Sequence, residues 1–357
     1  MVRSAPAGEH GCVVRDGRLP PQGGLPPTEE AGRAVVEIAC DESGFSGTNL
    51  LDASTPVFTH ASIDLRVEEA VELIRTLRSG SWWPPSEFKS GQLLRGRQAG
   101  QAMEWFLAAL SGRAHVHLVD KEYFLVTRII DLFLAEPSYA AGTRLTQDHR
   151  PAALTLYRAG RAGGRDWNVF LAVFVEMVRA KRRRQPDRSI VERFFQARDS
   201  LAGAGLGAEA AGVLDGLSRT RVWAVLTRLA HDDRSIPPPL EPMLPALAET
   251  VLFWSGGQRQ VMVIHDEQSA LTVGRLRRLQ QVLADAASVP AAGAQDPGAP
   301  QARVSPLAGL VTVDSRDDPR VQVADLLAGV ARRSPDIGDD GLIQPLLSPT
   351  SLRDPER

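Results

Sequence analysis

Val35-Val36-Glu37-Ile38-Ala39-Cys40 leads directly into Asp41-Glu42-Ser43-Gly44. The first six residues are apolar and rich in β-branched side chains, which is typical of a strand buried on both faces. Asp41 then lies at the carboxyl end of this strand, and Ser43-Gly44 begins a turn. Residues 57–65 are predicted to form a second strand in a hairpin with the first. Ligands bind at the carboxyl ends of strands in open α/β sheets, so Asp41 is a candidate site residue.

The rest of the chain alternates strands with helices on both sides of a helical region. Residues from about 145 to 255 show helical periodicity and are rich in Ala, Leu and Arg. This order predicts an α/β fold, a mixed sheet flanked by helices, interrupted by a large all-helical insertion. Three further strands are predicted, each followed by an acidic residue: 115–119 before Asp120, 260–265 before Asp266, and 310–313 before Asp314.

Composition sets limits on the class of protein. Residues 1–33 are rich in Pro and Gly and are predicted to be a disordered tail, residues 34–333 a single domain, and residues 334–357 a loosely ordered tail. A net charge of −2 does not suggest a general polyanion binder. Two cysteines cannot make a disulfide framework and fit a reducing cytoplasm. The sequence shows no signal peptide and no membrane span, so we expect a cytoplasmic protein without membrane association.

Another acidic residue, Asp325, lies inside an apolar helical pattern. Gln322, Asp325 and Gly329 share one face of a helix predicted over 320–333, and the other faces are apolar. Aspartate is unfavourable in the middle of a helix and is rarely buried without a partner. Gly329 would let this helix pack closely against the sheet, where Asp325 could reach carboxylates at strand ends. A functional role for Asp325 is therefore favoured over a purely structural one.

Clustered carboxylates repel one another unless cations bridge them. Mg²⁺ or Mn²⁺ suits an all-oxygen site. Two such ions can activate a water and stabilise the leaving oxygen in phosphodiester cleavage. The pattern thus predicts a metal-dependent phosphoryl-transfer site.

The acidic motifs resemble those of the domain of unknown function 3800 family, which is ribonuclease H-like. The resemblance spans about residues 34–332, is least specific in the helical middle, and rests on Asp41-Glu42-Ser43-Gly44, Glu87-Phe88-Lys89, Asp266-Glu267, Asp314-Ser315 and Gln322–Gly329. It implies a ribonuclease H-like fold and a metal-dependent nuclease acting on nucleic acid. Carried over, Asp41 matches the carboxylate of the first strand, Asp266 that of a later central strand, and Asp325 that of the final helix.

The same resemblance gives supporting roles to other residues. Glu42 would assist the three aspartates, and Lys89 or Lys121 would neutralise a phosphate or orient the carboxylates. Asp120 and Asp314 are further acidic candidates, and His265 could hydrogen-bond or carry a proton.

Structural alternatives stay open at several of these positions. Asp41 could cap a turn, and Asp120, Asp266 or Asp314 could cap the helix that follows it. His115 and His117 would project from one face of their strand, either as a core pair or as metal ligands. For the whole chain, the alternatives are a ribonuclease H-like binding or scaffold protein without catalysis, or a hydrolase of nucleotides or other phosphoesters.

Overall fold

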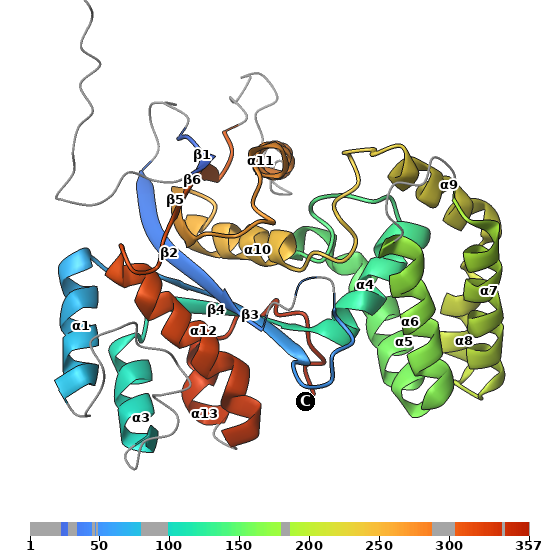
Figure 1. Cartoon of the computed structure of the whole chain (residues 1–357), viewed down its shortest axis with the longest axis horizontal. Coiled ribbons are helices and arrows are strands. Elements are labelled where there is room, and N and C mark those ends of the chain that lie inside the picture. The colour runs from blue at the N-terminus through green and yellow to red at the C-terminus, as the bar shows by residue number, and fades with distance from the viewer. Residues whose placement is uncertain are drawn as a thin grey trace, which may run out of the picture.

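The computed structural model describes residues 23–27, 34–44, 47, 49–79, 99–179, 186–287, 304–337 and 340–356. They form an α/β fold around a mixed six-stranded sheet with the order β1-β6-β5-β2-β3-β4 (Figure 1). The strands are β1 (Gly23–Leu25), β2 (Val35–Ser43), β3 (Val57–Ile63), β4 (Ala114–Asp120), β5 (Gln260–Asp266) and β6 (Leu307–Val313).

Strand direction divides the sheet into two halves that meet at β2. On one side β2, β3 and β4 form an antiparallel meander, which confirms the predicted hairpin. On the other side β5 runs parallel to β2, and β6 runs parallel to β5. The carboxyl ends of β2, β5 and β6 therefore lie at one edge of the sheet.

The first strand corrects the prediction that residues 1–33 form only a disordered tail. Gly23–Leu25 pairs antiparallel with β6 and closes that side of the sheet. Gly24 has a φ of +114°, and a Cβ on it would lie 2.0 Å from the carbonyl oxygen of Leu310. Only glycine fits such a close approach of two backbones. The glycine content that predicted disorder therefore permits strand pairing at Gly24.

Helices cover both faces of the sheet (Figure 1). One face packs against α1 (Val67–Ser79), α3 (Ala99–Ala109), α12 (Pro319–Ile337) and α13 (Asp340–Ile343), around a core that includes Ala39, Ala61 and Ile264. The other face packs against α10 (Met243–Ser255) and α11 (Val273–Ala287). Ile38 and Cys40 of β2 belong to this second core because successive strand residues point to opposite faces.

The described residues between 121 and 255 contain helices and no strand. They are α4 (Lys121–Phe133), η1 (Arg144–His149), α5 (Arg150–Ala162), α6 (Arg165–Arg179), α7 (Arg188–Gly203), α8 (Ala208–Asp215) and α9 (Arg219–Ala230), followed by α10. Buried aromatic side chains join the bundle, with the rings of Phe170 and Phe194 stacked 5.2 Å apart. None of the helices that the structure describes has the length and apolar character of a membrane span.

The C-terminal segment differs from the loosely ordered tail that its sequence predicts. After η2 (Gln344–Leu346), it runs along β4, where Val116 pairs with Leu347 and Val119 with Leu352. Backbone hydrogen bonds of 2.7 Å from Ser348 to Val116 and 2.8 Å from Leu352 to Leu118 hold it there. The segment covers the edge of β4, which would otherwise expose unpaired backbone groups.

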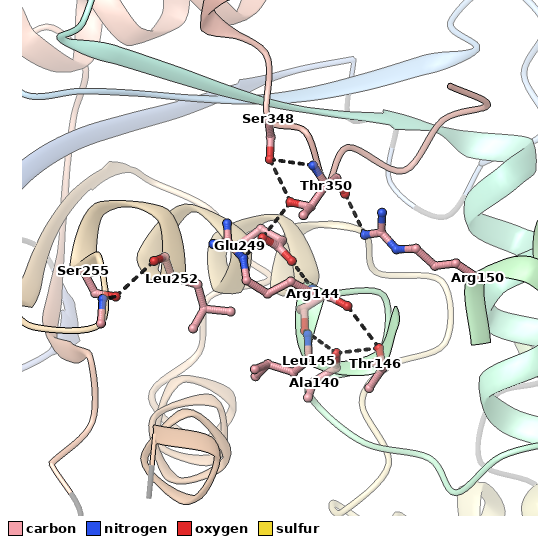
Figure 2. Close-up of polar contacts among 12 residues, drawn as sticks. Ala140, Arg144, Leu145, Thr146, Arg150, Glu249, Leu252, Ser255, Ser348 and Thr350 are labelled. Atoms are coloured by element: carbon pink, nitrogen blue, oxygen red, sulfur yellow. Dashed lines mark hydrogen bonds and ion pairs between the residues drawn. The ribbon is translucent and has the colours of Figure 1, made fainter. Parts of the chain in front are cut away.

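Glu249 of α10 anchors this segment from below (Figure 2). Its side chain is 0% exposed and accepts hydrogen bonds from the Arg144 backbone N–H, from Arg144 Nε at 2.9 Å and from Thr350 Oγ1 at 2.8 Å. Arg150 Nη2 also donates to the Thr350 carbonyl at 2.7 Å. One buried carboxylate thus joins α10, the start of η1 and the C-terminal segment.

Candidate active site

The parallel register of β2 and β5 places Asp41 beside Asp266. Cys40 pairs with His265, so the next residue of each strand lies at the shared carboxyl end. Both aspartates point to the face that carries Ala39 and Ile264, which is the face under α12. Asp41 is only 5% exposed. A buried strand end thus presents two carboxylates to one helix.

That helix brings the third predicted aspartate. α12 packs across β2 and β3, and Thr59 Oγ1 of β3 donates a 2.8 Å hydrogen bond to the Ala328 carbonyl of α12. Asp325 lies one turn earlier and is half-buried. Burial raises the pKa of Asp41 well above its usual value, and the charges of Glu42, Asp325 and Asp266 raise it further. The charges of Asp266 and Asp325 therefore both act on the carboxyl group of Asp41.

The two strand-end aspartates are held in place by backbone donors. The N–H of Glu42 donates to Asp41 Oδ1 at 2.7 Å, and the N–H of Ser315 donates to Asp266 Oδ1 at 3.0 Å. Partial burial raises the pKa of Asp266, although its backbone hydrogen bonds oppose this. Each carboxylate keeps further oxygen lone pairs beyond these single hydrogen bonds, so each has capacity for a cation.

Glu42 points to the opposite face of the sheet. It lies across from His60 in the register of β2 and β3, and its Oε1 accepts a hydrogen bond from Gln268 Nε2. Its Oε2 lies 4.0 Å from His265 Nε2. Burial raises the pKa of Glu42 to about 7. Glu42 therefore belongs to the same end of the sheet as the aspartates, but to the layer under α10.

In that layer, four buried histidines line the sheet: His60, His115, His117 and His265. His265 Nδ1 lies 2.9 Å from the Asp266 carbonyl, which can only accept, so Nδ1 carries the proton. Burial lowers the pKa of His265 to about 4, so its Nε2 is an acceptor at neutral pH. His60 Nε2, at 3.2 Å, then donates to it, and His60 Nδ1 accepts from Thr250 Oγ1 at 2.9 Å.

Sequence reasoning missed His60 and Thr250 as members of this chain of hydrogen bonds. The alternation of residues 57–63 places His60 on one face of a strand, so its position could have been predicted from the sequence. Thr250 comes from a helix that is distant in the sequence, and no local pattern indicates its contact with His60. His115 and His117 share this face, as predicted, and their ring nitrogens make no hydrogen bond to the described residues. The His115 ring instead stacks on Phe253 with 4.0 Å between centroids.

The remaining candidate site residues make local structural contacts or lie outside the described residues. Asp120 caps α4 by accepting from Tyr123 N at 2.9 Å, which confirms the capping alternative. Asp314 binds Arg316, whose side chain and backbone N–H lower the pKa of Asp314 to about 2. Lys121 Nζ donates to Thr55 Oγ1 at 3.2 Å, close to the carboxyl end of β4. Lys89 and Glu87 lie outside the described residues.

Carboxylate oxygens of Asp41, Asp266 and Asp325 are suitable ligands for a hard divalent cation, but they are not arranged around a common centre. Its ligands would be carboxylate oxygens, and the charged groups that raise the pKa of Asp41 are all carboxylates. A cation would relieve that repulsion. Within the described ranges, however, no group of three or more His, Cys, Asp or Glu has the spacing of a metal site.

Comparison with known proteins gives no match: no family model, curated protein or solved structure is significantly similar to the chain. The resemblance to the domain of unknown function 3800 family therefore stays a prediction that rests on the motifs themselves.

Proposed function

We propose that the protein is a divalent-metal-dependent nuclease, or a related phosphodiester-cleaving enzyme, similar to the domain of unknown function 3800 family. The observation that carries this proposal is that Asp41, at a buried strand end, lies beside Asp266 of β5 and is acted on by the charges of both Asp266 and Asp325 of α12. These are the first-strand, later-strand and final-helix positions that the resemblance assigns to catalysis.

The arrangement of the strands supports the ribonuclease H-like part of the proposal. An antiparallel meander, β2-β3-β4, is continued on its other side by parallel β5 and β6, and the carboxylates gather where the two halves meet. The helical stretch between β4 and β5 would then be an insertion into that fold, placed to help select the substrate.

In this proposal Asp41, Asp266 and Asp325 hold Mg²⁺ or Mn²⁺. A bound ion would supply an activated water and would stabilise the leaving oxygen of the phosphodiester. The backbone N–H groups of Glu42 and Ser315 orient two of the carboxylates. Gln268 fixes Glu42 beside His265, and Glu42, whose pKa is raised to about 7, would be the group that takes up or releases a proton there. Lys89 would neutralise a substrate phosphate, nucleic acid would be the partner, and the buried free thiol of Cys40 suits a cytoplasmic location.

Asp325→Asn tests the proposal, with Asp314→Asn as the matched control. Labelled single- and double-stranded DNA and RNA would be incubated with Mg²⁺ or Mn²⁺, and with EDTA. We expect metal-dependent cleavage that Asp325→Asn lowers on the order of a hundredfold or more. Asp314→Asn makes the same chemical change at the next strand end, where Arg316 already binds the carboxylate, and should keep the activity. A folded Asp325→Asn protein with full activity, or one that unfolds, would contradict the assignment.

A non-catalytic binding or scaffold protein is the second candidate. The described residues hold no preformed metal-binding group, which favours it. Titration with Mn²⁺ separates the two, because a nuclease must bind the ion and Asp41→Asn must weaken that binding, whereas a scaffold needs neither. Turnover of nucleotides or small phosphoesters, without cleavage of polymers, would instead indicate a small-molecule hydrolase.

A further inference from the structure

A pocket of about 430 Å³ lies between the loop that joins α9 to α10 and the start of α11. On the loop side, Leu229, Ile236 and Pro238 form its apolar wall, beside Asp232, Asp233 and Arg234. Arg275 and Arg278 of α11 line the helix side. The volume is in the range of small-molecule sites, and the two walls differ in chemistry. A ligand that fills the pocket would therefore have an apolar part and an anionic part.

The acidic residues of the pocket are already matched by cations. Asp233 accepts hydrogen bonds from Arg228 Nε at 2.8 Å and from Ser235, and the pKa of Asp233 is lowered to about 2 by these contacts. Asp232 lies 3.6 Å from Arg234, and both side chains are mostly exposed. These acidic side chains therefore leave little negative charge to balance the arginines of α11.

Arg275 and Arg278 are the arginines on the α11 side of the pocket, and the charge of Arg275 also acts on Glu241, where it opposes the rise in pKa caused by burial. They are separated by three positions on α11, so they lie on one face of the helix, and each is half-buried. Arg275 Nη1 donates to the Ala270 carbonyl at 3.0 Å. Among the described residues, no carboxylate lies within ion-pair distance of either guanidinium. Both arginines act on the phenol of Tyr139, a lining residue that is 5% exposed, and oppose the rise in its pKa caused by burial.

We propose that this pocket binds a nucleotide, with its phosphate on Arg275 and Arg278 and its base against the apolar wall. Guanidinium groups present parallel N–H donors that match the oxygens of a phosphate. Leu229, Ile236 and Pro238 are the apolar lining residues against which the flat ring of a base can pack. Tyr139 lies near the arginines, where its hydroxyl can donate to the same phosphate.

The proposal does not depend on the nuclease activity. The pocket is connected to the carboxylate cluster by residues 267–272, which follow Asp266 and precede α11, yet it contains none of the proposed metal ligands. Its nucleotide could be a free mononucleotide or one residue of a nucleic-acid strand. The phosphate-and-base chemistry is the same in both cases, and a binding experiment separates them.

Calorimetric titration of the full chain in EDTA tests the pocket without any contribution from a metal. The probes are adenosine 5′-monophosphate, inorganic phosphate and a short single-stranded oligonucleotide. We expect the mononucleotide to bind more tightly than phosphate, and Arg278→Gln to weaken it about tenfold or more. Arg278→Lys, which keeps the charge but loses the fork of donors, should give an intermediate loss.

Arg277→Gln is the matched control because Arg277 is the adjacent arginine of the same helix and is exposed outside the pocket. It should leave mononucleotide binding unchanged. Binding of the oligonucleotide alone, weakened by Arg278→Gln but not by Arg277→Gln, would support the pocket and assign its nucleotide to a strand. The proposal is overturned if no probe binds at millimolar concentration, if phosphate binds as tightly as the mononucleotide, or if both variants weaken binding equally.

Discussion

The two faces of the central sheet hold ionisable side chains in opposite ways. Under α12, the negative charges of Asp266 and Asp325 disfavour ionisation of the buried Asp41. Under α10, His60, His115, His117 and His265 are buried together, and burial lowers the pKa of each imidazole. Neutral imidazoles do not repel one another, so these four histidines need no counter-ion at neutral pH.

The difference follows from the alternation of side chains along a strand. Asp41 and Glu42 are adjacent in the sequence, as are His265 and Asp266, yet each pair is divided between the faces. On the α12 face, a cation would relieve the repulsion between carboxylates. On the α10 face, the buried histidines lower the stability of the fold only in acid. The predictions below test this contrast.

Acid should have the largest effect, through the histidine face. A histidine whose pKa is lower in the folded state than its unfolded value of about 6.5 stabilises the fold above that value and loses this contribution as the pH falls. At pH 5 the loss is about 2 kcal/mol for each histidine that stays neutral. His115, with a pKa of about 3, and His265, with one of about 4, meet that condition. Urea unfolding at pH 7.5 and pH 5 measures the loss.

A double variant isolates the histidines from the carboxylates, whose raised pKa values act in the opposite sense. His115→Leu with His117→Leu should reduce the loss of stability between pH 7.5 and pH 5 by at least the contribution of His115, about 2 kcal/mol, because burial also lowers the pKa of His117. His231→Gln, at an exposed position after α9, is the control. An unchanged pH dependence in the double variant would show that these imidazoles are not buried as neutral groups.

Glu249→Gln should give the next largest effect, a loss of stability of about 2–3 kcal/mol. The substitution leaves donors of Arg144 and Thr350 facing an amide that cannot accept from all of them. Denaturant unfolding at pH 7.5 gives the free energy. Glu241→Gln, beside the start of α10, is the matched control because burial already raises the pKa of Glu241 to about 7. Equal losses in both variants would show that Glu249 does not anchor the C-terminal segment.

Local sequence pattern was enough to predict five of the six strands that the structure describes and the acidic residues at the ends of four of them. Val35 to Cys40 is a short apolar run that is followed by a turn. Neighbouring residues in the sequence are therefore enough to predict β2 and the position of Asp41. Asp325 was recognisable because an acidic residue interrupts an apolar helix. The placing of Asp41 beside Asp266 also follows from topology, since parallel strand ends share one edge of the sheet.

The sequence could not predict elements whose stability comes from distant partners. β1 has three residues, too few for a periodic signal, and exists because β6 offers an unpaired edge. The C-terminal segment was predicted to be loosely ordered, yet Thr350 donates a hydrogen bond to Glu249 and is itself hydrogen-bonded to Ser348. The chain from Thr250 through His60 to His265 joins three separate elements, and no local pattern reports such a contact.

Asp41→Asn should have the smallest effect on stability and the opposite sign to Glu249→Gln. The folded-state pKa of Asp41 is raised above its unfolded value, so the ionised carboxylate destabilises the fold at neutral pH and stops doing so once acid protonates it. Asparagine keeps the acceptor for the Glu42 N–H but removes the charge. In EDTA at pH 7.5 we therefore expect a gain on the order of 1 kcal/mol, which shrinks toward pH 4. Mn²⁺ should stabilise the unmodified chain and not the variant. Asp314→Asn, which removes a carboxylate bound by Arg316, should gain nothing. A loss of stability in metal-free Asp41→Asn would mean that Asp41 is a turn cap rather than one member of a repelling cluster, and the contrast between the two faces would then not hold.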